Sequence, residues 1–142
     1  MDNLKIAKDK MINDNRNLVV VKDGKVIFES SKKGIVPMYD LYNEEITGDI
    51  YISDKFIGGG AAKFILNFKG RTVELYTNII SKGALKLLES KGIKVQYEKI
   101  VEKILNRTGD DFCPVEKISM ENEDFNIFYN KIEAFLLQTK QI

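Results

Sequence analysis

The chain has 142 residues, enough for one domain with a core of ordinary size, and its 22 basic and 21 acidic residues leave a net charge of +1. This balance gives no reason to expect nucleic acid or an anionic membrane as an obligatory partner. The chain has no histidine and a single cysteine, Cys113, which excludes a zinc site with three or four His and Cys ligands, an intramolecular disulfide, and every histidine-activated nucleophile.

The first part of the chain predicts a helix, two strands and a second helix. Apolar residues recur at helical spacing over the first dozen residues, which favours an amphipathic helix. Two β-branched runs at 18–21 and 26–28 flank an Asp-Gly pair at 23–24. This pattern predicts a β-hairpin, because glycine takes the positive φ of a tight turn. Pro37 suits the first turn of the helix that follows.

The rest of the chain alternates predicted strands with predicted helices. The strands that alternating apolar residues predict are 50–52, 73–77 and 93–97. The helical segments expected between and after them are 61–68, 81–92, a short turn at 100–105, and a short helix from Pro114. A polar loop is expected at 106–111. Large apolar residues from Phe125 to Leu136 indicate a long amphipathic C-terminal helix.

This order of elements predicts the fold class. Strands separated by helices of this length pair in parallel through right-handed crossovers, and the hairpin adds one antiparallel strand at an edge. We therefore expect an α/β protein of three layers, with a mixed, mostly parallel five-stranded sheet, an N-terminal β-hairpin and helices on both faces. We expect residues 1–120 to form this domain. Residues 121–142 are expected to be a helix that packs on the domain or forms a dimer interface.

The main candidate site is the join between the central strand and the helix that follows it. A strand that ends in glycines before a helix presents free backbone N–H groups where the helix dipole is positive, which favours a phosphate or carboxylate ligand. The candidate ligand-binding residues at this join are Asp54, Lys55, Gly58, Gly59, Gly60 and Ala61. A simpler interpretation also stays open, in which the glycines only bring the helix close to the sheet or permit a positive φ. A solvated charge pair is the simpler interpretation of Asp54 and Lys55.

Cys113 and the polar loop supply the remaining candidates. Cys113 stands just before a predicted helix, where a thiol becomes a better nucleophile. The alternative is a small buried apolar residue. Arg107 has the shape and charge to bind a phosphate or carboxylate, and the aspartates at 110–111 could bind Mg²⁺, although surface loops carry such residues routinely. The candidate catalytic residues are therefore Cys113, Asp54 and Lys55.

Several segments resemble one small microbial family. The segments that carry the resemblance are 20–30, 33–39, 54–55 with 58–62, and 105–107 with 113–117. Over residues 4–118 the chain is similar to family eighteen ninety-three of the domains of unknown function. The order of elements also resembles the cytidine deaminase fold. This resemblance implies a deaminase-like fold without zinc chemistry, because the His-x-Glu and Pro-Cys-x-x-Cys motifs of deaminases are missing at the helix starts 36–39 and 58–62.

Three functions stay open. The favoured one is a non-zinc, deaminase-like domain that binds a small anionic, nucleotide-like molecule at the helix start 58–62, with no cofactor and no metal. The second is a zinc-independent enzyme that uses Cys113 or the pair Asp54 and Lys55. The third is a structural or partner-binding protein whose cleft is vestigial. We also expect a cytoplasmic protein without a membrane partner, because no apolar run approaches the length of a membrane span, and we leave a homodimer open.

Overall fold

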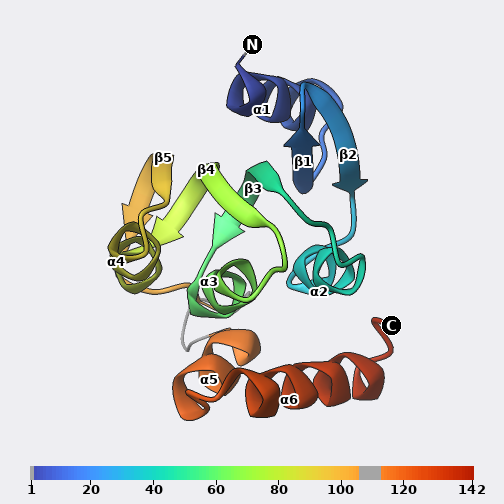
Figure 1. Ribbon diagram of the computed structural model, residues 1–142. Coiled ribbons are helices and arrows are strands. Elements are labelled where there is room, and N and C mark those ends of the chain that lie inside the picture. The colour runs from blue at the N-terminus through green and yellow to red at the C-terminus, as the bar shows by residue number, and fades with distance from the viewer. Residues whose placement is uncertain (1, 106–112) are drawn as a thin grey trace.

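A computed structural model describes residues 2–105 and 113–142 of the chain, and Figure 1 shows how its elements are arranged. The helices in these residues are α1 (Asn3–Asn13), α2 (Val36–Asn43), α3 (Gly59–Leu66), α4 (Lys82–Ser90), α5 (Pro114–Glu121) and α6 (Phe125–Gln138). The strands are β1 (Leu18–Lys22), β2 (Lys25–Ser30), β3 (Asp49–Ile57), β4 (Arg71–Ser81) and β5 (Lys94–Val101).

The strands form one mixed five-stranded sheet in the order β2-β1-β3-β4-β5. β1 pairs antiparallel with both β2 and β3, whereas β3 with β4 and β4 with β5 are parallel. A tight turn connects β1 to β2, and both of its central residues have a positive φ, 52° at Asp23 and 77° at Gly24. The strand that opposes the others is therefore β1, inside the sheet, and not an edge strand as expected from sequence.

Several elements are longer than their local pattern indicates. β3 continues past 50–52 to Ile57, because β4 extends beside it and pairs Phe56 with Ile79. β5 continues to Val101 through residues where a helical turn was expected, because Ile100 pairs with Ile80 of β4. In both places pairing with a neighbouring strand overrides the local sequence preference. Helix α3 begins at Gly59, two residues before the expected start.

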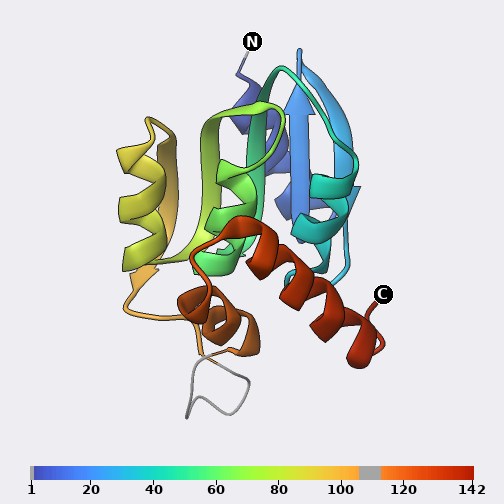
Figure 2. The same ribbon diagram turned by 60° about the horizontal axis from the view of Figure 1, so that its bottom comes forward.

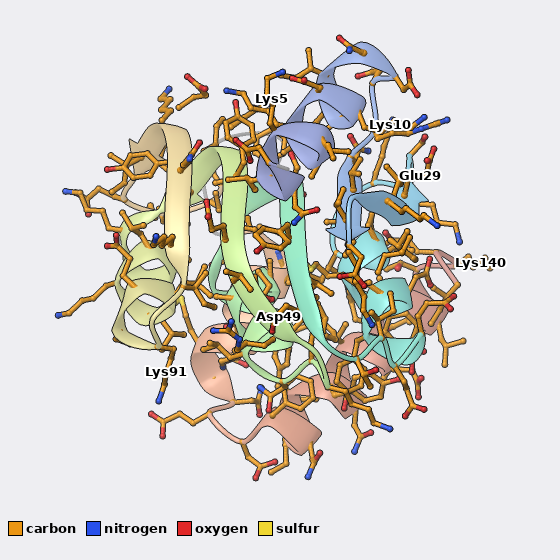
Figure 3. All side chains as sticks on the ribbon, turned by 45° about the horizontal axis from the view of Figure 1, so that its top comes forward. Lys5, Lys10, Glu29, Asp49, Lys91 and Lys140 are labelled. Carbon is orange, nitrogen blue, oxygen red and sulfur yellow. The ribbon has the colours of Figure 1, made fainter. Side chains whose placement is uncertain are left out.

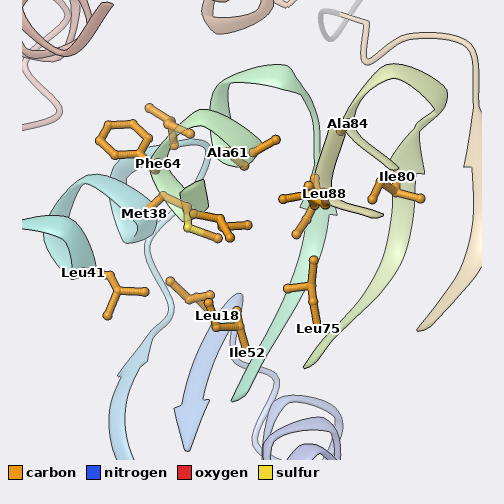
Figure 4. Packing of buried hydrophobic residues seen from close by; sticks show 14 of the residues in the cluster. Leu18, Met38, Leu41, Ile52, Ala61, Phe64, Leu75, Ile80, Ala84 and Leu88 are labelled. Atoms are coloured by element: carbon orange, nitrogen blue, oxygen red, sulfur yellow. The ribbon is translucent and has the colours of Figure 1, made fainter. Parts of the chain in front are cut away.

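Helices cover both faces of the sheet, and the two last helices add a further layer. α1 packs on one face of the sheet, and α2, α3 and α4 pack on the other (Figure 1). α5 and α6 lie beyond α2 and α3, on their side away from the sheet (Figures 1 and 2). The larger core lies between the sheet and α2–α4, where Ile52, Leu75 and Leu88 are fully buried (Figure 4).

Helix α6 belongs to this core. Phe128, Ile132 and Leu136 recur every four residues, so they lie on one stripe of the helix, and all three are fully buried. The rings of Phe64 and Phe128 are 5.5 Å apart and meet edge to face. The rings that join this cluster from α2 and α6 are Tyr39, Tyr42, Phe125 and Tyr129. This aromatic cluster fixes α6 against α2 and α3.

Charged side chains of both signs are spread over the outside of the molecule, as Figure 3 shows for Lys5, Lys10, Glu29, Asp49, Lys91 and Lys140. Many of them meet an opposite charge: Lys10 lies 2.5 Å from Asp14, and Arg71 contacts both carboxylate oxygens of Asp49 at 3.0 and 3.1 Å. Exposed pairs of this kind contribute little stability. Among residues 2–105 and 113–142, no helix has the length and apolar character that crossing a membrane requires.

Candidate functional site

A cavity of about 540 Å³ opens where β3 ends and three helices begin. The N-cap residues of all three helices line the cavity: Ile35 for α2, Gly58 for α3 and Cys113 for α5. Other residues that line the cavity are Lys33, Asp54, Lys55, Phe56, Ala61, Val115 and Glu116. Because a helix N-terminus carries partial positive charge, three of them together favour an anion in this space.

The cavity brings together residues that are distant in sequence. Of the residues proposed from sequence, Asp54, Lys55, Gly58, Ala61 and Cys113 all line it. Gly59 and Gly60 lie beside it in the first turn of α3. Arg107 and the aspartates at 110–111 lie outside the described residues. The structured part of the chain brings no three His, Cys, Asp or Glu side chains together in an arrangement that could hold a metal ion.

Asp54 is a polar residue that follows two apolar side chains on one face of β3. Side chains alternate along a strand, so Asp54 points to the same face as Ile50 and Ile52, whose side chains belong to the larger core. The residue is half-buried and borders the cavity. This burial raises the pKa of Asp54 to about 7, against a smaller opposing effect of the backbone N–H groups of Phe56 and Lys55.

Asp54 and Lys55 do not act as a charge pair. The Lys55 ammonium donates a hydrogen bond to Asn15 Oδ1 at 2.7 Å, and its backbone N–H donates to the Asn17 carbonyl at 3.2 Å. The simpler sequence interpretation of these neighbours, a solvated ion pair, is therefore wrong. Alternation along β3 separates the two side chains, and Asp54 is left as a carboxyl that faces the cavity.

The N-terminus of α3 is capped by a side chain of the protein itself. The backbone N–H of Gly59 donates to Glu116 Oε2 at 3.0 Å, and that of Gly60 donates to Glu116 Oε1 at 3.3 Å. These two donors were expected to bind a ligand anion directly. In the described conformation they are occupied by the Glu116 carboxylate, so that part of the sequence hypothesis is wrong for this state of the molecule.

The glycines make room for α5. A side chain on Gly58 would overlap the Glu116 carboxyl, and one on Gly60 would lie 2.6 Å from Val115 Cγ1. A Cβ on Gly59 would be 3.1 Å from Ser119 Oγ. The three contacting residues of α5 are Val115, Glu116 and Ser119, which lie on one face of that helix. The simpler interpretation of the glycines was close packing on the sheet, but the element that they admit is another helix, α5.

α3 in turn caps the C-terminal end of α5. The Lys63 ammonium donates hydrogen bonds to the backbone carbonyls of Ser119 and Asn122, which end that helix. It also lies 5.0 Å from the centre of the Phe128 ring. Burial lowers the pKa of Lys63, while the charges of Glu123 and Glu116 raise it. Each helix thus supplies a charge of the favourable sign to one end of the other.

Cys113 occupies the helix start that the sequence predicts. It is the N-cap residue of α5, it is half-buried, and its carbonyl accepts from the Lys117 backbone N–H at 3.1 Å. It lines the cavity and is neither fully buried nor fully exposed. The contribution of Glu116 and Phe56 to the same cavity was missed from sequence. A glutamate in the first turn of a predicted helix was the available signal for Glu116, but nothing local indicated that it would cap α3.

Comparisons with known proteins identify the family. The family model described as "TM1506: Domain of unknown function (DUF1893)" matches residues 6–136. The chain is similar to the crystal structure of a DUF1893 family protein, TM1506, from Thermotoga maritima, with 27% identity, a TM-score of 0.80, and coverage of 93% of this chain and 88% of that one. No curated protein matches. The family match extends through most of α6, beyond the resemblance at 4–118. The chain belongs to the DUF1893 family.

Proposed function

We propose that this chain is a binding protein with a cytidine deaminase-like fold that takes a small anionic, nucleotide-like molecule in the cavity beside Asp54. The observation that carries this proposal is the convergence on one cavity of the end of β3 and three helix N-termini, of which that of α3 is capped by Glu116. Two of these helix starts, those of α2 and α3, correspond to the places where the deaminase resemblance puts the zinc motifs. Here they carry Ile35 and Gly58 at their N-caps, so the cavity is suited to binding and not to zinc chemistry.

The charge of the lining favours an anionic group. Lys33 lines the cavity from the segment between β2 and α2. Lys55 lines it from β3, but its ammonium is bound to Asn15. Burial raises the pKa of Asp54 to about 7, so its carboxyl carries less negative charge at neutral pH than an ordinary aspartate. The Glu116 carboxylate is directed at the N–H groups of α3. The charge of Lys33 and the helix dipoles are then only partly neutralised, so a phosphate or carboxylate of a ligand gains energy at the rim.

The apolar part of the lining favours a planar ring. The Phe56 side chain is 57% exposed at the cavity, although Phe is usually buried. Ile35 and Val115 contribute apolar surface to the same cavity. An exposed aromatic ring beside an apolar wall can stack with a base-sized ring at about 1–3 kcal/mol. A molecule with a planar ring and an anionic group, which is the chemistry of a nucleotide, uses both parts of the lining.

A thermal-shift panel tests this function directly. The panel contains nucleoside monophosphates, the corresponding nucleosides and inorganic phosphate, so the ring and the anion are tested separately. We expect a monophosphate to raise the unfolding temperature more than either part alone, because binding to the folded state stabilises it by mass action. The proposal is contradicted if no member of the panel raises the unfolding temperature of the wild-type chain, or if Phe56→Ala binds a member as well as wild type does.

One observation favours catalysis as a second candidate function. Asp54 and Cys113 line the same cavity, and a carboxyl whose pKa is about 7 can accept or donate a proton at neutral pH. If the site turns a ligand over, Asp54→Asn should abolish the reaction and leave binding in place. A ligand that is recovered unchanged after prolonged incubation with the wild-type chain assigns the site to binding alone.

A further inference from the structure

We propose that α5 is a strap that opens as a unit from the folded domain and so controls entry to the cavity. The inference rests on the proposed function for what enters the cavity, but the opening itself is a property of the ligand-free chain. α5 packs against α3 and α6, and two of its residues, Val115 and Glu116, form part of the cavity wall. When α5 moves away, that wall moves with it.

The apolar contacts of α5 are few. Ser119 is the one buried residue of α5, and its side chain is polar. Val115 and Ile118 are only partly buried against the core, and Met120 is 62% exposed. Because buried apolar area is the main term that holds an element to a domain, α5 has little of it. Elements with few buried apolar contacts open at free energies well below that of global unfolding.

Polar contacts at both ends of α5 join it to α3. At its start, the Glu116 carboxylate accepts the N–H groups of Gly59 and Gly60. At its end, the carbonyls of Ser119 and Asn122 accept hydrogen bonds from Lys63. Both sets of hydrogen bonds join α5 to the same short helix, α3, and both place a charge at a helix terminus. They are charge-assisted hydrogen bonds, so each is stronger than a neutral one.

The helix that follows does not depend on α5 for its own start. Asp124 is the N-cap residue of α6, and its carboxylate accepts the Ile127 N–H at 3.0 Å. The buried stripe of α6 lies in the aromatic cluster and the main core. α5 can therefore leave α3 while α6 stays docked. After that movement the N–H groups of Gly59 and Gly60 face the cavity and the solvent, and the glycines present no side chain to block access.

Native-state hydrogen exchange on the ligand-free full chain tests the strap, with each amide followed by NMR. The backbone amides of Ser119 and Met120 report on α5, and that of Ile52, in the central strand, reports on global unfolding. We expect the α5 amides to exchange with a much weaker denaturant dependence than Ile52. Met11→Ala removes core packing on the opposite face of the sheet, so it should speed exchange at Ile52 and leave the α5 amides within about twofold of wild type.

Two variants in α5 itself test the contribution of the Glu116 hydrogen bonds. Glu116→Ala should speed exchange of the α5 amides by about tenfold to a hundredfold, the range that corresponds to loss of charge-assisted hydrogen bonds. Glu121→Ala removes the same charge from an exposed position on the same helix and should change these rates by less than about threefold.

Two results would overturn the strap. The first is exchange of the α5 amides with the full denaturant dependence of Ile52, accelerated equally by Met11→Ala. The second is an equal effect of Glu116→Ala and Glu121→Ala. Neither result depends on a ligand, so failure of the strap is distinguishable from failure of the proposed function, which the thermal-shift panel tests.

Discussion

Helices α5 and α6 are neighbours in the chain and lie in the same outer layer, yet they are attached in opposite ways. α6 buries Phe128, Ile132 and Leu136 completely, whereas the attachment of α5 consists mainly of a carboxylate at one end and a lysine at the other. The difference follows from position, because α6 covers apolar surface of α2 and α3 and α5 covers the polar start of α3. In this molecule the apolar attachment gives stability, and the polar attachment lies beside the cavity.

The largest effect is expected where the apolar attachment of α6 is broken. Phe128→Ala removes a fully buried ring from the aromatic cluster and should lower the free energy of unfolding by about 3–5 kcal/mol. Leu137→Ala is the matched control, because that side chain is 57% exposed on the same helix, and it should change stability by less than about 0.5 kcal/mol. Urea unfolding followed by circular dichroism measures both. Equal losses in the two variants would mean that the stripe does not hold α6.

The next effect concerns Asp54, on the cavity side of the molecule. Its pKa in the folded state is raised from 3.8 to about 7, so the folded chain binds the proton more tightly than the unfolded chain. Protonation of Asp54 therefore stabilises the folded chain below about pH 4, and this stabilisation is lost as the pH rises to about 7. The full shift in the pKa of Asp54 corresponds to about 4 kcal/mol in the free energy of unfolding. Hydration through the cavity should reduce this effect to roughly 2–3 kcal/mol.

The difference between wild type and Asp54→Asn isolates this effect from the other titrating groups. Wild type should lose stability relative to the variant between pH 4 and pH 8, as measured by urea unfolding at each pH. If the difference between the two proteins is flat across this range, the Asp54 carboxyl is hydrated as in the unfolded chain.

A smaller effect is expected where the packing of α5 on α3 is disturbed. In Gly60→Ala the new methyl group would lie 2.6 Å from Val115 Cγ1, so we expect a loss of about 1–2 kcal/mol despite the higher helix propensity of alanine. Gly83→Ala is the control, because a Cβ at that exposed position in the first turn of α4 meets nothing within 4 Å, and it should change stability by less than about 0.5 kcal/mol. Thermal unfolding compares the two. A stabilised Gly60→Ala would show that α5 does not press on α3.

The smallest effect is expected at the cavity rim. Lys33→Gln removes one exposed charge that lines the cavity and should weaken binding of an anionic ligand about threefold to tenfold, with little change in stability. Lys25→Gln removes an exposed charge from the distant end of β2 and should leave the affinity unchanged. Calorimetric titration with the ligand found in the panel measures the ratio. Equal affinities in the two variants would place the ligand's anion away from Lys33.

Sequence reasoning was most successful where the signal was local. Apolar alternation and glycine positions predicted the α/β class and the five-stranded mixed sheet, and Pro114 predicted the start of α5 just after Cys113. The lengths of β3 and β5 could not be predicted, because they depend on pairing with β4. The same limit applies to the site: the glycines were visible, but the side chain that fills the space above them, Glu116, is more than fifty positions away in the chain.

The location of the ligand is the central claim, and one measurement tests it most directly. A ¹H–¹⁵N NMR titration of the wild-type chain with a nucleoside monophosphate reports every backbone amide at once. We expect the largest shifts at Phe56, Ala61 and Cys113, which three separate elements bring to one cavity. Shifts confined to another surface, such as the open depression between β2 and α2 that Phe28 and Tyr39 line, or no shifts at all at millimolar ligand, would contradict the account.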